Sequence, residues 1–101
     1  MTTCLMVRAR VDPEVRDRFD TWYETEHLPD AARTFGAARA RRGWSRDEES
    51  VHIALYEFPD RAAADRAMQS DGLGELIAEF DRLWEGRATR TRELLDLVQD
   101  I

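Results

Sequence analysis

Residues 51–58 read Val-His-Ile-Ala-Leu-Tyr-Glu-Phe, and this stretch is the clearest strand pattern in the chain. Its side chains alternate between two faces, one made of His52, Ala54, Tyr56 and Phe58 and the other of Val51, Ile53 and Leu55. Pro59 and Asp60 follow directly and end the strand, and Asp60 is a good N-cap for a helix. A strand followed at once by a helix predicts a fold that mixes both elements.

Two further strands are expected upstream, at residues 3–11 and 37–45. The first divides into a face of Leu5, Val7, Ala9 and Val11 and a face of Cys4, Met6, Arg8 and Arg10. The second divides into a face of Ala38, Ala40, Arg42 and Trp44 and a face of Arg39, Arg41 and Gly43. Residues 46–50 are polar and suit a hairpin loop that leads into residues 51–58.

A long helix is expected between these two strands. Asp12 is a natural N-cap and Pro13 suits the first helical position, so the helix should begin there and run to about Ala32. Pro29 is expected to break or kink this helix near its end. Helical spacing predicts two neighbouring stripes, one of Val15, Phe19, Trp22 and Glu26 and one of Phe19, Tyr23 and His27.

Helical patterns return after residue 60. A short helix is expected over residues 61–70, and Asp71-Gly72 is expected to interrupt it. An amphipathic helix then continues over residues 73–84, with Gly86 as the C′ glycine that ends it. Residues 88–98 fit either a strand or a helix, and the alternation near their start, with the need for a fourth strand, favours a strand.

The resulting order of strand, helix, strand, strand, helix and strand is that of a ferredoxin-like split βαβ, an α+β fold with a four-stranded antiparallel sheet. The chain has 101 residues, which suits a single domain over residues 1–101. Helices in this order can cover only one face of the sheet, so the other face needs a cover. A second copy is the simplest cover, and a homodimer is therefore expected.

Composition narrows the classes of function. The chain has 15 basic and 21 acidic residues and a net charge of −6, so nucleic acid is not an expected partner. All basic residues are arginine, which excludes a lysine Schiff base. Cys4 is the only cysteine, so no intrachain disulfide can form. The chain shows neither a signal-type segment nor an apolar run of roughly 18 residues, and a cytoplasmic protein with no membrane partner is expected.

Residues 22–29, Trp-Tyr-Glu-Thr-Glu-His-Leu-Pro, resemble the W-Y-x-x-E-H-x-P segment of dimeric α/β-barrel proteins, and above all that of EthD-like proteins. The resemblance implies a dimeric α/β barrel in which each subunit holds a small cavity between sheet and helices. This superfamily includes cofactor-independent monooxygenases of aromatic polyketides, polyketide cyclases, lactone isomerases and some haem enzymes. Its methylmuconolactone isomerase branch places one histidine late in the first helix and another at the start of the third strand, similar to His27 and His52 here.

His27 is the leading candidate for a catalytic residue. Its helical position places it beside Tyr23 and Glu26, and an imidazole oriented by a phenol or a carboxylate can move protons near neutral pH. His52 would join it across the cavity if its side of the strand faces the helices, or lie at the subunit interface if it faces the partner. The structural alternative is that Glu26 and His27 only hold the helix end by hydrogen bonds.

Other residues would shape the cavity. Tyr23 and Tyr56 are candidate hydrogen-bond donors to a phenol or a carbonyl of a ligand. The apolar candidates for substrate binding are Phe19, Trp22, Phe80 and Trp84, although aromatic residues at helical spacing usually form the core. Two histidines and one cysteine make a sparse set of metal ligands, so neither a metal nor another cofactor is expected. A haem bound by His27 is the alternative that the superfamily offers.

Two hypotheses of function stay open. In the first, the protein is an enzyme that binds a small aromatic or polyketide-like molecule and works by His-centred acid–base chemistry without a metal. The reaction would be an isomerisation, a cyclisation or a cofactor-free oxygenation, and in an oxygenation the substrate itself must form an electron-rich carbanion or enolate. In the second, the protein is a non-catalytic small-ligand-binding or accessory protein on the same dimeric scaffold.

Overall fold

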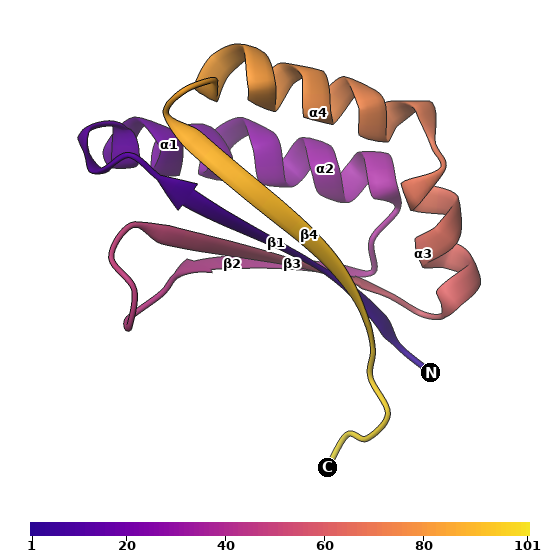
Figure 1. Ribbon diagram of the computed structural model, residues 1–101. Coiled ribbons are helices and arrows are strands. Elements are labelled where there is room, and N and C mark those ends of the chain that lie inside the picture. Colours follow the sequence, from indigo (N-terminus) through magenta and orange to yellow (C-terminus); the bar gives the residue numbers. More distant parts are fainter.

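Four strands form one antiparallel sheet in the order β2-β3-β1-β4, and the helices lie on one of its faces (Figure 1). The structure is a computed structural model and describes residues 1–101. The strands are β1 (Thr3–Val11), β2 (Arg39–Trp44), β3 (Val51–Phe58) and β4 (Ala88–Asp96). The helical elements are η1 (Pro13–Val15), α1 (Arg16–Trp22), the π-helical turn η2 (Tyr23–His27), α2 (Leu28–Phe35), α3 (Arg61–Met68) and α4 (Asp71–Trp84). The ferredoxin-like α+β prediction is confirmed, as is the choice of strand for residues 88–98.

The first helical segment differs from the expected helix at its far end. It begins at Pro13 as expected but runs to Phe35 instead of stopping near Ala32. Gly36 ends it with φ +63°, a left-handed conformation that glycine adopts at little cost. Pro29 neither breaks nor ends the segment, because it lies in the first turn of α2, directly after the π-helical turn.

The junction between α3 and α4 is also placed differently. The helices separate at Gln69 and Ser70, so Asp71 and Gly72 form the first turn of α4 and do not interrupt a helix. Gly72 lies where α4 passes close to α2, and a Cβ at this position would overlap the side chain of Thr34. The absence of a side chain at Gly72 therefore permits the close approach of the two helices.

Other boundaries shift by only a few residues. β2 is shorter than the expected strand at residues 37–45. Gly86 lies at the C′ position of α4 as expected, with φ +77°, in a tight turn that the Arg87 N–H closes by donating to the Trp84 carbonyl oxygen at 2.8 Å. α4 is the longest α-helix, with 14 residues. None of the helices combines the length and the apolar composition that a membrane crossing requires.

One hydrophobic core fills the space between the sheet and the helices. Phe19 of α1 is fully buried at its centre. The rings packed against it belong to Trp22, Tyr23, Trp44, His52, Phe80 and Trp84. His52 therefore faces the helices, which decides a question that strand alternation left open.

No helix covers the opposite face of the sheet (Figure 1). Strand alternation places on this face the partly exposed apolar side chains of Met6, Ile53, Leu55 and Leu95. Cys4 lies buried on the same face, and burial raises the pKa of its thiol. The expected second copy over this face stays a prediction.

Candidate functional site

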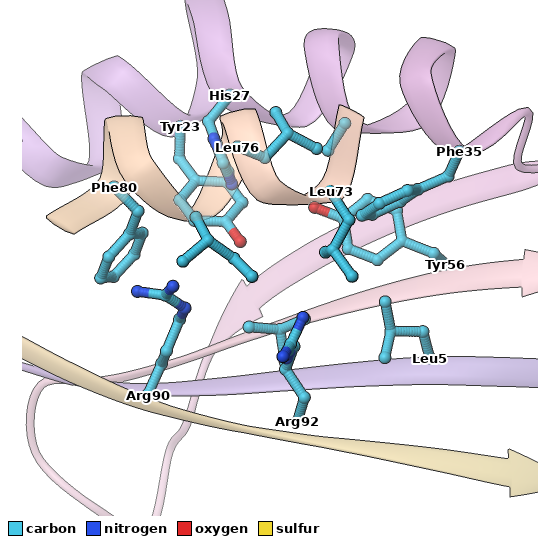
Figure 2. Close-up of a pocket in the computed structure, with 13 residues that line it drawn as sticks. Leu5, Tyr23, His27, Phe35, Tyr56, Leu73, Leu76, Phe80, Arg90 and Arg92 are labelled. Atoms are coloured by element: carbon cyan, nitrogen blue, oxygen red, sulfur yellow. The ribbon is translucent and has the colours of Figure 1, made fainter. Parts of the chain in front are cut away.

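A small cavity lies between the sheet and the helices α2 and α4 (Figure 2). Its volume is about 30 Å³, which is room for about two water molecules. Most of its wall is apolar, with Leu5 and Val7 from β1 and Leu76 and Ile77 from α4. The polar groups that line it are Tyr23 and His27 from η2, Tyr56 from β3, and Arg90 and Arg92 from β4.

The π-helical turn η2 has a local cause in the sequence. Within an α-helix, Pro29 would offer no N–H to the carbonyl of Thr25, and its ring would press against that carbonyl. The wider turn avoids this conflict, because the N–H of Leu28 donates to the carbonyl oxygen of Tyr23, five residues back. The proline is thus accommodated by one extra residue in the turn that precedes it.

This extra residue brings His27 against Trp22 and turns Glu26 outward. The rings of Trp22 and His27 stack with centroids 4.4 Å apart and planes at 23°. Glu26 is exposed on the outer side of the helix. The expectation that Glu26 shares the buried stripe of Trp22 is wrong, because α-helical spacing does not hold in this turn. Glu26 is therefore not in a position to orient the imidazole within the cavity.

His27 is buried and uncharged at neutral pH. Only 9% of its surface is exposed, and its Nδ1 has no hydrogen-bond partner. Burial, helped by the positive charge of Arg90, lowers the pKa of His27 to about 4 against an opposing effect of Asp30. The ring is therefore neutral at pH 7 and has a free nitrogen for a proton or a hydrogen bond.

Tyr23 and Tyr56 face each other at the cavity wall. Burial raises the pKa of Tyr23 to about 12 and raises that of Tyr56 as well. The interaction between the two hydroxyl groups lowers the pKa of Tyr23 and raises that of Tyr56. The Tyr23 ring also packs edge-on against His27, with centroids 4.8 Å apart. Both phenols stay protonated at neutral pH, so either hydroxyl can donate a hydrogen bond to a ligand.

His52 does not reach the cavity. It is fully buried behind Tyr23, with 4.3 Å between the two ring centroids, and Tyr23 separates it from His27. The reason is its place on β3, four residues from Tyr56 and toward the other end of the strand. The expected meeting of the two histidines across a cavity is therefore wrong, and His52 instead supports the ring of Tyr23 from behind.

A polar network fixes the tautomer of His52, and the ring stays neutral. Arg42 Nη1 donates to His52 Nε2 at 3.2 Å and to the carboxylate of Asp20 at 2.9 Å. Trp44 Nε1 donates to the same carboxylate at 2.8 Å. Because Nε2 accepts, the ring proton of His52 lies on Nδ1, which has no partner. Burial and the charge of Arg42 lower the pKa of His52 to about 4, so it stays neutral.

The aromatic candidates divide between cavity and core. Phe80 lines the cavity, whereas Phe19, Trp22 and Trp84 pack within the core and do not line it. The alternative of ordinary core packing therefore describes these three side chains. Phe35, which sequence reasoning did not select, lines the cavity and packs edge-on against Tyr56 at 5.3 Å.

Sequence reasoning also missed Arg90 and Arg92. In the β1–β4 register Arg90 pairs with Ala9 and Arg92 with Val7, so both arginines share the face of β4 that meets the helices. Arg90 donates to Asp81 at 3.0 Å, and its guanidinium lies 4.1 Å from the centre of the Phe80 ring. The alternation of Arg90-Thr91-Arg92 was the available signal. It showed that the two share a face, but only the register shows that this face meets the helices.

A four-stranded antiparallel sheet with helices on one face defines the class of ferredoxin-like α+β folds, and solved structures of EthD and antibiotic biosynthesis monooxygenase proteins share this fold. A variant of SnoaB, a cofactor-independent oxygenase from Streptomyces nogalater, is 18% identical with a TM-score of 0.74, over 99% of this chain and 96% of that one. An antibiotic biosynthesis monooxygenase is 18% identical with a TM-score of 0.67, over 96% and 99% of the two chains. An EthD family protein from Bacillus halodurans is 17% identical with a TM-score of 0.68, over 92% and 97%.

At these identities the likeness shows a shared fold. The sequence matches no protein-family model and no curated protein sequence. No group of three or more His, Cys, Asp and Glu side chains comes together to hold a metal ion.

Proposed function

We propose that this protein is a cofactor-free enzyme that oxygenates a small aromatic molecule, which lies in the open groove between α4 and β4 with its reacting edge at the small cavity between sheet and helices. One observation carries the proposal: a neutral imidazole with an unpartnered nitrogen shares a largely apolar cavity with two guanidinium groups. A base and positive charges around one apolar space suit a reaction that begins with removal of a proton. The fold is shared with a cofactor-independent oxygenase and an antibiotic biosynthesis monooxygenase, which supports this choice of reaction.

His27 is the base in the proposed reaction. It takes a proton from a phenol or an activated C–H of the substrate, and the electron pair stays on the substrate as an enolate or carbanion. The low pKa of His27 in the empty cavity opposes this transfer, but the new anion lies beside the imidazolium and stabilises it. Arg90, held by Asp81, adds a second positive charge near the anion. Tyr23 donates a hydrogen bond to a substrate oxygen.

Dioxygen is the oxidant. The substrate anion passes electrons to dioxygen, a C–O bond forms, and the proton held by His27 converts the resulting peroxide anion to a hydroperoxide. The O–O bond of this hydroperoxide then breaks, the outer OH leaves as water together with the remaining hydrogen on that carbon, and a carbonyl group is left. For anthrone the balance is anthrone plus dioxygen giving anthraquinone plus water, and no external reductant is consumed.

Oxygen uptake with anthrone as the substrate tests the proposal. His27→Ala should lower kcat/KM by about 100-fold or more, since a positioned base contributes that much to a proton transfer. Glu26→Gln is the matched control, because it changes the neighbouring residue on the exposed side of the same turn, and it should stay within about twofold of wild type. Wild-type turnover that survives in His27→Ala would contradict the role of His27, and a wild type that takes up no oxygen would contradict oxygenation.

The other reactions leave different signatures in the same assay. Isomerisation and cyclisation begin with the same proton transfer by His27, but their products form without oxygen uptake. The non-catalytic alternative gives saturable binding of a small ligand that is recovered unchanged. Product analysis by mass spectrometry beside the oxygen electrode therefore separates the three cases.

We also propose that two copies pair through the open face of the sheet. The face carries uncovered apolar side chains, including Ile53 and Leu55. It also carries charges of both signs, as in the ion pair of Arg41 with Glu57 at 2.6 Å. Ile53→Asp should reduce the mass in light scattering to that of one chain, 11.7 kDa. Leu83→Asp, on the exposed side of α4, should leave a dimer intact. A wild type that is already monomeric at micromolar concentration would overturn this proposal.

A further inference from the structure

We propose that the ligand of this cavity carries a carboxylate, and that Arg92 is the residue that binds it. The inference rests on the proposed function only in that the cavity takes a small aromatic molecule. It adds a requirement for the ligand, a planar apolar body with one negative charge at its outer end. No reaction step is needed for this requirement.

The position of Arg92 is the first support. Arg92 pairs with Val7 across the β1–β4 ladder, and both residues line the cavity. Figure 2 shows the side chains of Arg92 and Arg90 both rising from β4 toward the helices. Arg92 is exposed, so its charged end lies at the open side of the cavity, whereas His27 lies buried in the wall.

The pairing of the charges is the second support. Arg90 is already engaged, because Asp81 accepts from it at 3.0 Å and Phe80 packs against its guanidinium. Arg92 makes no ion pair and no side-chain hydrogen bond. No carboxylate lines the inner cavity, and Asp81, the carboxylate that lines the adjoining groove, is paired with Arg90. One unpaired guanidinium beside an apolar wall matches a ligand with one anionic group, since a guanidinium binds a carboxylate through two parallel hydrogen bonds.

The surrounding space is the third support. The inner cavity of about 30 Å³ adjoins an open groove of about 430 Å³ between α4 and β4. Ile77, Arg90 and Arg92 line both spaces, so the guanidinium of Arg92 stands where a ligand would pass from the groove to the cavity. A carboxylate on Arg92 leaves the ring of the ligand in the groove along Ile77, with one edge facing the inner cavity that Tyr23 and His27 line.

A pair of probes that differ in charge but hardly in shape tests the inference. 1-Hydroxy-2-naphthoate carries the carboxylate, and 1-hydroxy-2-naphthamide replaces it with a neutral group. Calorimetric titration of the full-length wild type should give tighter binding of the naphthoate by about tenfold or more, the size expected for a charged hydrogen-bonded pair. Arg92→Gln should remove this preference, Arg92→Lys should keep part of it, and neither should alter binding of the naphthamide.

Arg66→Gln is the matched control, since it removes one exposed arginine of α3 that makes no ion pair and lies away from the cavity. It should bind both probes like wild type. Equal affinity of the wild type for the two probes, absence of binding by both, or an undiminished preference in Arg92→Gln would each overturn the inference. Carboxylate preference that depends on Arg92, without any oxygen uptake by the wild type, would support the inference while contradicting the proposed oxygenation.

Discussion

The imidazole of His27 stacks on the indole of Trp22, with ring centroids 4.4 Å apart and planes at 23°. The two residues are five positions apart, and the π-helical turn brings this spacing onto one face. With α-helical spacing the neighbour of Trp22 would be Glu26. The turn therefore places an imidazole against Trp22 where a regular helix would place a carboxylate.

Pro29→Ala tests whether the proline causes the π-helical turn that places His27, instead of Glu26, against Trp22. Alanine supplies the N–H that proline lacks, so the turn should revert toward an α-helix and move His27 away from Trp22. The pKa of His27, followed by NMR titration of the ring, should rise from about 4 toward its ordinary value near 6.5. The melting temperature should be equal to or above that of wild type. An unchanged pKa of His27 in this variant would show that other packing holds the turn.

Stability should depend on pH through the two buried histidines. Each ring has a pKa of about 4 when folded against 6.5 ordinarily, so the unfolded chain binds more protons between these values. Stability is therefore fully present above pH 6.5 and falls as the pH drops toward 4, by roughly 3 kcal/mol per histidine. Urea unfolding at pH 7, 5.5 and 4 measures the slope, and His27→Gln should remove about half of it. A slope that His27→Gln leaves unchanged would mean that His27 is not buried in its neutral form.

Arg42→Met should destabilise the fold more than the same change at Arg41. Arg42 hydrogen bonds to His52 and Asp20, so its loss leaves a buried ring nitrogen without a donor and costs about 1–3 kcal/mol. Arg41 pairs with Glu57 on the open face at 2.6 Å, and an exposed pair of this kind contributes at most about 1 kcal/mol. Chemical unfolding of the two variants compares these costs directly. Equal losses would contradict a stabilising role for the network around His52.

Gly72→Ala should destabilise the packing of α4 on α2. The added Cβ overlaps the methyl group of Thr34, and such overpacking costs about 1–3 kcal/mol. Thr34→Ser removes that methyl group, so the double variant should recover most of the loss in thermal unfolding. Gly74→Ala, in the same helix with open space at its Cβ position, should be neutral or gain up to about 1 kcal/mol. Failure of Thr34→Ser to rescue Gly72→Ala would assign the cost to the helix backbone.

The sequence by itself determined the elements of this fold. Alternation over residues 51–58 and 3–11 and the cap and proline at Asp12-Pro13 are local patterns, and the structure reproduces the strand and helix starts that they predict. The order of these elements then limited the fold to a sheet with helices on one face. Local spacing also identified Tyr23 and His27 as neighbours, because residues four apart lie close in either kind of helical turn.

Only the tertiary structure decided which of these side chains share the cavity. The exposure of Glu26 depends on one extra residue in a helical turn, which α-helical periodicity does not reveal. The pairing of β1 with strands distant in sequence decides that His52 lies away from the cavity and that Arg90 and Arg92 line it. Register between distant strands is set by the packing of the whole core, so local sequence patterns do not contain it.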